Sequence, residues 1–503
     1  MKRLFILFFI GLIAVIVGAN RGLPNDKFIF SHLLSRPVSN GEPSLAVYVE
    51  CRDTLIVDKQ KWKNQFIRDN AIYEIRHDFN LKGDSLHIPD NCLLRFNGGS
   101  FYNGTLIGNH TSIEGGEINS LNSVYLEGTW GGSCRPEWLG ARGNGKTDDT
   151  EAIQRTIELF EKVEFRDATY LVRADRIDGI ITDYTDEGAC ALYAGHDLSI
   201  SGNNSTIKLY HTDKAYTKSK NYYALVCDGS LEIDGITIDG QYSTYRGTYG
   251  IQLRASGNKV SQCTFKNMGS SGIVFNGSYS NHSENNFVTD VSIENCGNSI
   301  FCVFVDNSSF ENISMHRVSE GFDFDKLCSN IKVCNVTFDG LRGKGADAAV
   351  EINGGHDFIV EDCDINGAKI GVLINGKPRK DRVGLPVDTK SYNIIVRRCN
   401  IRNTVSYGVT LGSTFYRNYN SYDQKDIQFE DVHVYNSGLQ GFHLTGDGIS
   451  LNNCSALDCK KAAILVNNYH RRIIINHFIN GSGNLSKEKI DEKKVQLNNI
   501  VTE

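Results

Sequence analysis

Apolar and polar residues alternate in a five-residue segment that recurs along the C-terminal half of the chain. Its second and fourth residues are apolar each time, as in Ile251 and Leu253, and its first residue is small. The copies lie at 250–254, 272–276, 299–303, 321–325, 349–353, 371–375, 408–412, 441–445 and 463–467. Strict alternation predicts a strand with one buried face. Because the copies return at intervals of 22 residues or more, as from 250 to 272, we expect a solenoid of stacked β-coils.

One helix and a smaller β-rich stretch are expected before this stack. Residues 147–160 form an amphipathic pattern with Asp148 as the expected N-cap, and a solenoid end needs such a cover. Residues 86–108 alternate and contain Asn-Gly turns, which predicts a small β-roll. The sequence therefore predicts a β-rich segment at 20–135, the main stack at 136–480 and a polar tail at 481–503.

The first residues have the pattern of a secretory signal. Met1-Lys2-Arg3 is basic, residues 4–17 are apolar, and small residues follow up to Ala19. We expect a signal peptide at 1–19, with an uncleaved membrane anchor as the alternative. The mature protein is therefore expected to be exported, as a periplasmic, outer-surface or secreted protein without stable membrane insertion.

Composition narrows the possible partners. The net charge of −6 argues against a nucleic-acid-binding protein, which would be basic. The 14 cysteines include four at equivalent places in their coils, Cys263, Cys363, Cys399 and Cys454, and no CxxC pair occurs. We interpret the thiols as small buried packing groups, not as zinc ligands.

Residues Trp138 to Gln154 (WLGARGNGKTDDTEAIQ) resemble the opening motif of the pectate-lyase-like superfamily. The resemblance implies an all-β, right-handed, single-stranded parallel β-helix, the fold of polygalacturonase-like hydrolases, polysaccharide lyases, glucanases and phage tailspikes. The preceding stretch is similar to exported proteins of polysaccharide-utilisation loci in gut Bacteroidetes, which implies a Gram-negative source. Asp148 and Asp149 lie within the cap, so we interpret them as structural.

The superfamily resemblance implies an active cleft across one parallel sheet, and we take the recurring strand as that sheet. Its outward positions carry acids in only two neighbouring coils, namely Asp323, Asp325 and Glu351. Residues two apart on a strand are separated by about 6.6 Å and neighbouring coils by about 4.8 Å. Three carboxylates this close either raise the pKa of one of them or bind a cation. The first outcome suits glycoside hydrolysis, and the second suits Ca²⁺ bound by all three, with a base such as Lys326 for β-elimination.

Basic and amide side chains near these acids predict an anionic substrate, because Arg and Lys bind carboxylates and sulfates. The expected substrate-binding residues are Arg254, Asn353, Arg342, Lys344, Lys377, Arg379 and His443. The leading hypothesis is an exported lyase that cleaves an acidic, uronate-containing polysaccharide. The alternatives are an inverting, polygalacturonase-like hydrolase, whose Asn-Thr-Asp and Gly-Asp-Asp motifs are absent here, and a non-catalytic glycan-binding β-helix.

Overall fold

The computed structural model describes residues 53–502, apart from 116–119, 122, 182–186, 212–220, 242–246, 342–347, 377–378, 381–385, 388–389, 413–423 and 482–494. The chain divides into two units, Met1–Asp53 and Thr54–Glu503, and the second contains every element reported below. The predicted signal peptide at 1–19 lies outside the described residues. No helix among the described residues is long and apolar enough to span a membrane.

A small parallel sheet begins the second unit, where a β-roll was expected. Its strands are β1 Thr54–Ile56, β2 Ile72–Ile75, β5 Leu93–Phe96, β7 Gly104–Gly115, β4 Ser85–His87 and β8 Val124–Gly131. A second parallel pair consists of β3 Asp78–Asn80 and β6 Ser100–Tyr102. Alternate residues such as Tyr73, Leu94 and Leu106 point into a core of their own, and the short helix η1 Trp62–Gln65 packs Trp62 against it.

The cap consists of the 3-10 helix η2 Pro136–Leu139 and the helix α1 Thr150–Leu159. Helix α1 buries Ile153 and Ile157 against the first coils of the stack. The expected N-cap was wrong by one residue, because the helix begins at Thr150 and its N-cap is Asp149. The Asp149 carboxylate accepts hydrogen bonds from the backbone N–H groups of Arg142 and Gly143, so it holds the preceding loop instead of the first helical turn.

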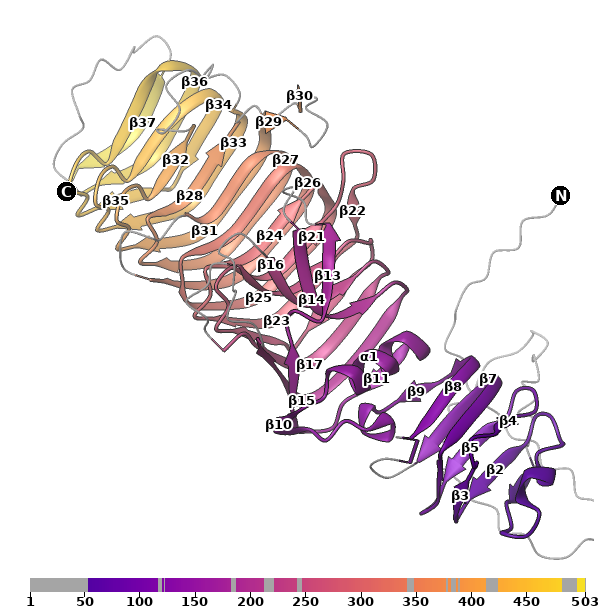
Figure 1. Ribbon diagram of the computed structural model, residues 1–503. Helices are drawn as coiled ribbons and strands as arrows, with labels where there is room; N and C mark the ends of the chain where they lie inside the picture. The colour runs from indigo at the N-terminus through magenta and orange to yellow at the C-terminus, as the bar shows by residue number, and fades with distance from the viewer. Residues whose placement is uncertain are drawn as a thin grey trace, which may run out of the picture. The chain divides into compact units, whose positions relative to one another are not determined.

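The main stack is one continuous sheet of 27 strands wound into coils (Figure 1). In chain order its strands are β9 Ser133–Cys134, β10 Asn144–Asp148, β11 Lys162–Glu164, β12 Thr169–Arg173, β13 Ile177–Ile181, β14 Glu187–Ala194, β15 Leu198–Tyr210, β16 Asn221–Cys227, β17 Leu231–Asp239, β18 Thr248–Leu253, β19 Lys259–Ser261, β20 Thr264–Lys266, β21 Ser271–Asn276, β22 Ser283–Glu284, β23 Phe287–Glu294, β24 Asn298–Val303, β25 Val305–Val318, β26 Glu320–Gly340, β27 Ala348–Asn366, β28 Ile370–Asn375, β31 Ser391–Arg402, β32 Val409–Leu411, β33 Gln424–Tyr435, β34 Phe442–Asn452, β35 Ser455–Leu457, β36 Ile464–Asn480 and β37 Val495–Thr502. Its pairings are parallel except for β13 with β14, and a separate antiparallel pair joins β29 Arg379–Lys380 to β30 Pro386–Val387. The expected all-β parallel β-helix is therefore confirmed.

The recurring strands stack in register, with their apolar residues turned inward. One inward row runs through Ile251, Ile273, Ile300, Phe322, Val350, Val372, Val409, Phe442 and Ile464. All nine are buried, as predicted for the inward face. The expectation of only one buried face was wrong, because outward residues such as Gln252, Leu373 and Thr410 are also only 1–5% exposed. The small first residue has a steric cause, because a Cβ on Gly408 would lie 2.7 Å from the Gly441 carbonyl oxygen of the next coil.

Amide ladders fix the corners between strands. Asn267, Asn403 and Asn436 adopt left-handed backbone conformations, as expected for sharp bends. The side-chain amide of Asn436 donates to the Asn403 oxygen at 2.8 Å, and Asn403 donates to Asn366 at 2.8 Å. Asn366 donates in turn to Asp339 at 3.0 Å, where a carboxylate that only accepts starts the ladder.

The stack extends beyond residue 480, where we expected only a polar tail. Strand β37 pairs with β36, and Val495 and Leu497 lie beside Ile473 and Ile475. The same alternation as in earlier coils therefore continues to the last strand. The 13 cysteines among the described residues are all free, and every one except Cys334 is buried, including the four expected to pack inside the coils.

Candidate functional site

The outward face of the recurring strands brings the predicted acids together. Asp323 of β26 pairs with Glu351 of β27 in the neighbouring coil, and Asp325 pairs with Asn353. The neighbours of this acid pair in the stack are apolar. Phe301 lies beside Asp323 in the preceding coil, and Leu373 lies beside Glu351 in the following coil. The strand register therefore places Asp323 beside Glu351, as the repeat predicted.

These acids differ in their access to solvent. Asp323 and Glu351 are half-buried, whereas Asp325 is 0% exposed although it points away from the core. A ligand from solvent can therefore contact the carboxylates of Asp323 and Glu351, whereas that of Asp325 is covered.

Glu320 joins the site, a residue that the alternation did not single out. One carboxylate oxygen each of Glu320, Asp323 and Glu351 lies within 4.8 Å of the others. Ca²⁺–oxygen distances are about 2.3–2.6 Å, so ligands on opposite sides of one ion lie up to about 5 Å apart. The converging group thus contains Glu320 in the place where we expected Asp325, and its size fits a calcium ion. An acid immediately before Gly321, in the coil that already holds two, was the available signal.

Asn353 ties the two accessible acids to each other. Its side-chain nitrogen donates to Glu351 Oε1 at 2.6 Å and to Asp323 Oδ1 at 3.2 Å. Its own oxygen accepts from Asn375 Nδ2 at 3.2 Å. One side-chain amide therefore holds both carboxylates in place. Predicted as a substrate-binding residue, it lies 1% exposed beneath that pair.

Lys326 occupies the corner that follows Asp325. It is 7% exposed, adopts a left-handed backbone with φ of 56°, and places its ammonium 5.9 Å from the centre of the Phe304 ring. This is within the range of a cation–π contact. The predicted base is therefore next to the acids in sequence, with its stem packed on the preceding coil.

The other predicted substrate-binding residues lie farther along the face or outside the described residues. Arg254 forms an ion pair with Asp228 at 3.0 Å. His443 stacks on Tyr407, and burial lowers its pKa, so the imidazole is neutral at pH 7. Each lies three rungs from the acid pair, about 14 Å. Arg342, Lys344 and Lys377 fall in segments that are not described, and only the backbone of Arg379 is placed, in β29.

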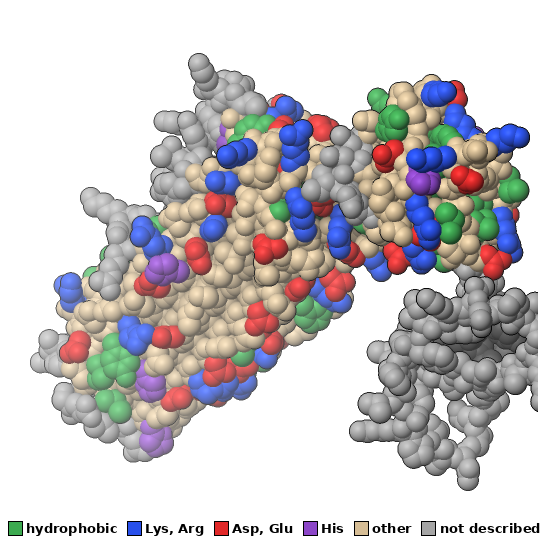
Figure 2. All heavy atoms as spheres, turned by 90° about the horizontal axis from the view of Figure 1, so that it is seen from below, with side chains coloured by type: hydrophobic (Ala, Val, Ile, Leu, Met, Phe, Trp, Pro, Cys, Tyr) green, Lys and Arg blue, Asp and Glu red, His purple; other side chains and the backbone are tan. Residues whose placement is uncertain are grey.

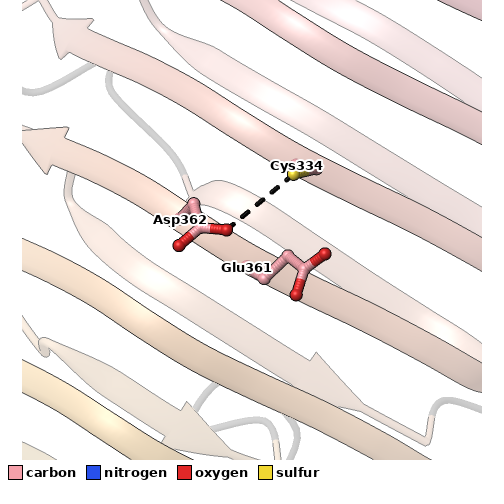
Figure 3. A group of neighbouring side chains, drawn as sticks. All are labelled: Cys334, Glu361 and Asp362. Atoms are coloured by element: carbon pink, nitrogen blue, oxygen red, sulfur yellow. Dashed lines mark hydrogen bonds between the residues drawn. The ribbon is translucent and has the colours of Figure 1, made fainter.

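A second acidic group, on another face of the coils, has a different environment. Cys334, Glu361 and Asp362 lie together on neighbouring strands (Figure 3), with Cys334 Sγ 4.0 Å from Asp362 Oδ2. Burial raises the pKa of Glu361, but hydrogen bonds from Arg397 and Arg398 outweigh it and hold that pKa below its usual value. Glu361 lies 2.6 Å and 2.7 Å from these guanidinium groups, so its charge is neutralised by the protein.

Charges of both signs are mixed on one face of the molecule. Figure 2 shows Lys and Arg side chains beside Asp and Glu side chains on the face that it draws. The group around Asp323 is therefore defined by the convergence of its carboxylates on the outward ladder.

Comparison with known proteins identifies the class. Residues 224–380 match the family described as "Right handed beta helix region", which includes the coils that carry Asp323 and Glu351. The match agrees with the parallel β-helix that the strand pairings show, and the fold class expected from the sequence is confirmed. No curated protein matches this sequence.

Solved structures with a similar fold include enzymes and an adhesin. The A-module of the mannuronan C-5 epimerase AlgE6 from Azotobacter vinelandii is 15% identical, with a TM-score of 0.45, over 73% of this chain and 99% of that one. The polygalacturonase of Erwinia carotovora is 13% identical, with a TM-score of 0.43, over 65% and 94%. The surface adhesin PfbA of Streptococcus pneumoniae is 12% identical, with a TM-score of 0.40, over 69% and 91%.

Proposed function

We propose that this protein acts on carbohydrate and cleaves an acidic, uronate-containing polysaccharide by β-elimination at the outward face around Asp323. The observation that carries the proposal is the convergence of Glu320, Asp323 and Glu351 within 4.8 Å on that face. Three carboxylates around one point form a site for a hard cation such as Ca²⁺. Export to the periplasm, the outer surface or the medium remains part of this proposal.

The proposed chemistry follows from the charges. Glu320, Asp323 and Glu351 would hold the cation, which would supply positive charge to neutralise the carboxylate of a uronate unit and to acidify the proton on the adjacent carbon. A base removes that proton, the bond from the neighbouring ring carbon to the glycosidic oxygen breaks, and a carbon–carbon double bond forms. The departing oxygen takes a proton. Lys326 is the proposed base, and Arg342, Lys344, Lys377 and Arg379 are proposed to bind further acidic units.

The spacing of Asp323 and Glu351 argues against inverting hydrolysis by this pair. Inversion needs a gap of about 6.5–9.5 Å between two carboxyl groups to admit a water molecule. The oxygens of Asp323 and Glu351 approach more closely than that, within 4.8 Å. Asp325 is buried, so we propose that it supports its neighbours and does not contact the polymer.

The test compares elimination and hydrolysis on uronate polymers, with and without a chelator. Wild type is expected to produce new ultraviolet absorbance together with reducing ends, and the chelator is expected to abolish both. Asp323→Asn and Glu351→Gln are expected to lose turnover by at least 100-fold, a magnitude common for groups that stabilise developing charge. Asp362→Asn, in the other acidic group, is the matched control and keeps full turnover.

Three results would contradict the proposal. Reducing ends without new absorbance would mean hydrolysis. Binding without turnover would mean a glycan-binding protein. Full activity of Asp323→Asn would remove the site from this face.

A further inference from the structure

An unusual corner lies beside the acidic group. Phe304 directly follows β24, and Lys326 and Leu327 lie at the equivalent bend of the next coil, within β26. All three have a left-handed backbone, with φ of 52°, 56° and 59°. Such a conformation costs about 1–2 kcal/mol for a residue with a Cβ. Among the described residues with positive φ, Phe304 and Leu327 are the only bulky apolar ones. Strain of this kind is concentrated at functional sites, which makes the corner a place to look for a ligand.

Phe304 anchors an exposed ring. Tyr279 is 53% exposed, and its ring meets the Phe304 ring edge-on, with centroids 6.1 Å apart and an interplanar angle of 80°. Phe304 itself is 5% exposed, and His282 covers it from another side at 5.3 Å. The edge-on contact holds Tyr279 by one side of its ring and leaves much of the ring accessible.

The backbone that carries Tyr279 is fixed as well. Ser278 and Asn281 form an antiparallel bridge with backbone hydrogen bonds of 2.9 Å and 3.1 Å, which closes a two-residue turn with Tyr279 at its tip. The far side of the turn is tied down by His282, whose Nδ1 lies 2.7 Å from Asp306 Oδ2. An exposed aromatic ring held this rigidly loses little conformational freedom when it binds a ligand.

The register relates this ring to the acids. Val303 pairs with Asp325 across one coil spacing, about 4.8 Å, and Phe304 follows Val303 directly. Tyr279 follows the end of β21, two coil spacings from the coil of Asp323 and three from that of Glu351, which is about 10 Å and 14 Å along the stack. A ring with an apolar face and a hydroxyl group at its tip suits a sugar, which offers C–H groups on its faces and hydroxyl groups on its rim.

We propose that Tyr279, supported by Phe304, is a stacking subsite for one pyranose unit of a polysaccharide that crosses the acidic group. This inference rests on the proposed function for the identity of the polymer. The subsite contributes binding and takes no part in bond cleavage.

The experiment measures binding and turnover separately on the full chain. Dissociation constants are measured for polygalacturonate, alginate, hyaluronan and neutral dextran with wild type, Tyr279→Ala and Tyr279→Phe. Tyr392→Ala is the matched control. Tyr392 is likewise an exposed tyrosine, at 40%, and its ring stacks on that of His356 on another face. Thermal melts of each variant confirm that it is folded.

Tyr279→Ala is expected to weaken binding about tenfold, as truncation of an exposed aromatic anchor does. Tyr279→Phe keeps the ring and stays within about twofold of wild type, and Tyr392→Ala is unchanged. The subsite is refuted if Tyr279→Ala binds as wild type, if Tyr279→Phe loses as much as Tyr279→Ala, or if wild type binds none of these polymers.

The two proposals fail separately. Weaker binding by Tyr279→Ala without new absorbance from wild type upholds the subsite and refutes elimination. Turnover by wild type with unchanged binding by Tyr279→Ala refutes the subsite alone.

Discussion

Calcium should stabilise this protein through the group of Glu320, Asp323 and Glu351. The perturbation is Asp323→Asn, which removes the charge at the centre of the group while keeping its size. Because one oxygen of each acid lies within 4.8 Å of the others, a single ion can contact all three. We expect wild type to melt at a higher temperature in calcium than in chelator, and Asp323→Asn to melt at the same temperature in both.

The magnitude follows from binding linkage. Exposed calcium sites of extracellular modules have Kd values of about 10⁻⁴–10⁻³ M, so 10 mM Ca²⁺ stabilises the folded state by about 1.4–2.7 kcal/mol. Unfolding entropy is about 2.1 cal/mol/K per residue, which over the roughly 450 residues of Thr54–Glu503 converts this to a rise in Tm of about 1.5–3 °C. Differential scanning calorimetry resolves a shift of this size.

The control is Glu361→Gln in the second acidic group. Its carboxylate is already bound by two guanidinium groups, so its removal should lower Tm in both buffers and leave the calcium shift intact. A wild-type Tm that is the same in calcium and in chelator would refute the cation site. A calcium shift that survives in Asp323→Asn but disappears in Glu361→Gln would move the site to the other face.

Three further outcomes are expected. The pKa of Glu361 is held below its usual value in the folded protein, so its contribution to stability is present at neutral pH and is lost as the pH falls below about 4.5. The stability of Glu361→Gln should therefore fall less steeply in acid than that of wild type. An acid-unfolding curve with the same slope as wild type would contradict this. Asn403→Ala loses two ladder hydrogen bonds and places an alanine at a left-handed position, so its free energy of unfolding, measured in urea, should fall by about 1–3 kcal/mol. Asn403→Gly should recover the part that is due to backbone strain. Equal losses in both variants would assign the whole effect to the hydrogen bonds. Alkylation of the native protein, followed by mass spectrometry, should modify Cys334 before the other described cysteines; its thiol reacts slowly near pH 7 because burial raises its pKa, and early labelling of Cys363 would contradict the packing.

The repeat in the sequence was enough to predict the coils. Alternating apolar residues mark the inward face of a strand, and a fixed interval places equivalent residues above one another. The adjacency of Asp323 and Glu351 followed from that spacing alone, and the register bears it out. The end of the stack was missed because Val495–Thr502 follows a long polar stretch that hides its alternation.

The sequence by itself therefore determined the solenoid, its inward residues and the two coils that carry the acids, because all three depend on a local period. Only the tertiary structure decided which side chains converge. Glu320 joins Asp323 and Glu351 although it lies outside the alternating positions, and Asp325 is buried although it points outward. Tyr279 reaches Phe304 through a turn between coils. Such contacts depend on how corners and neighbouring coils pack, and a period of 22 residues carries no information about them.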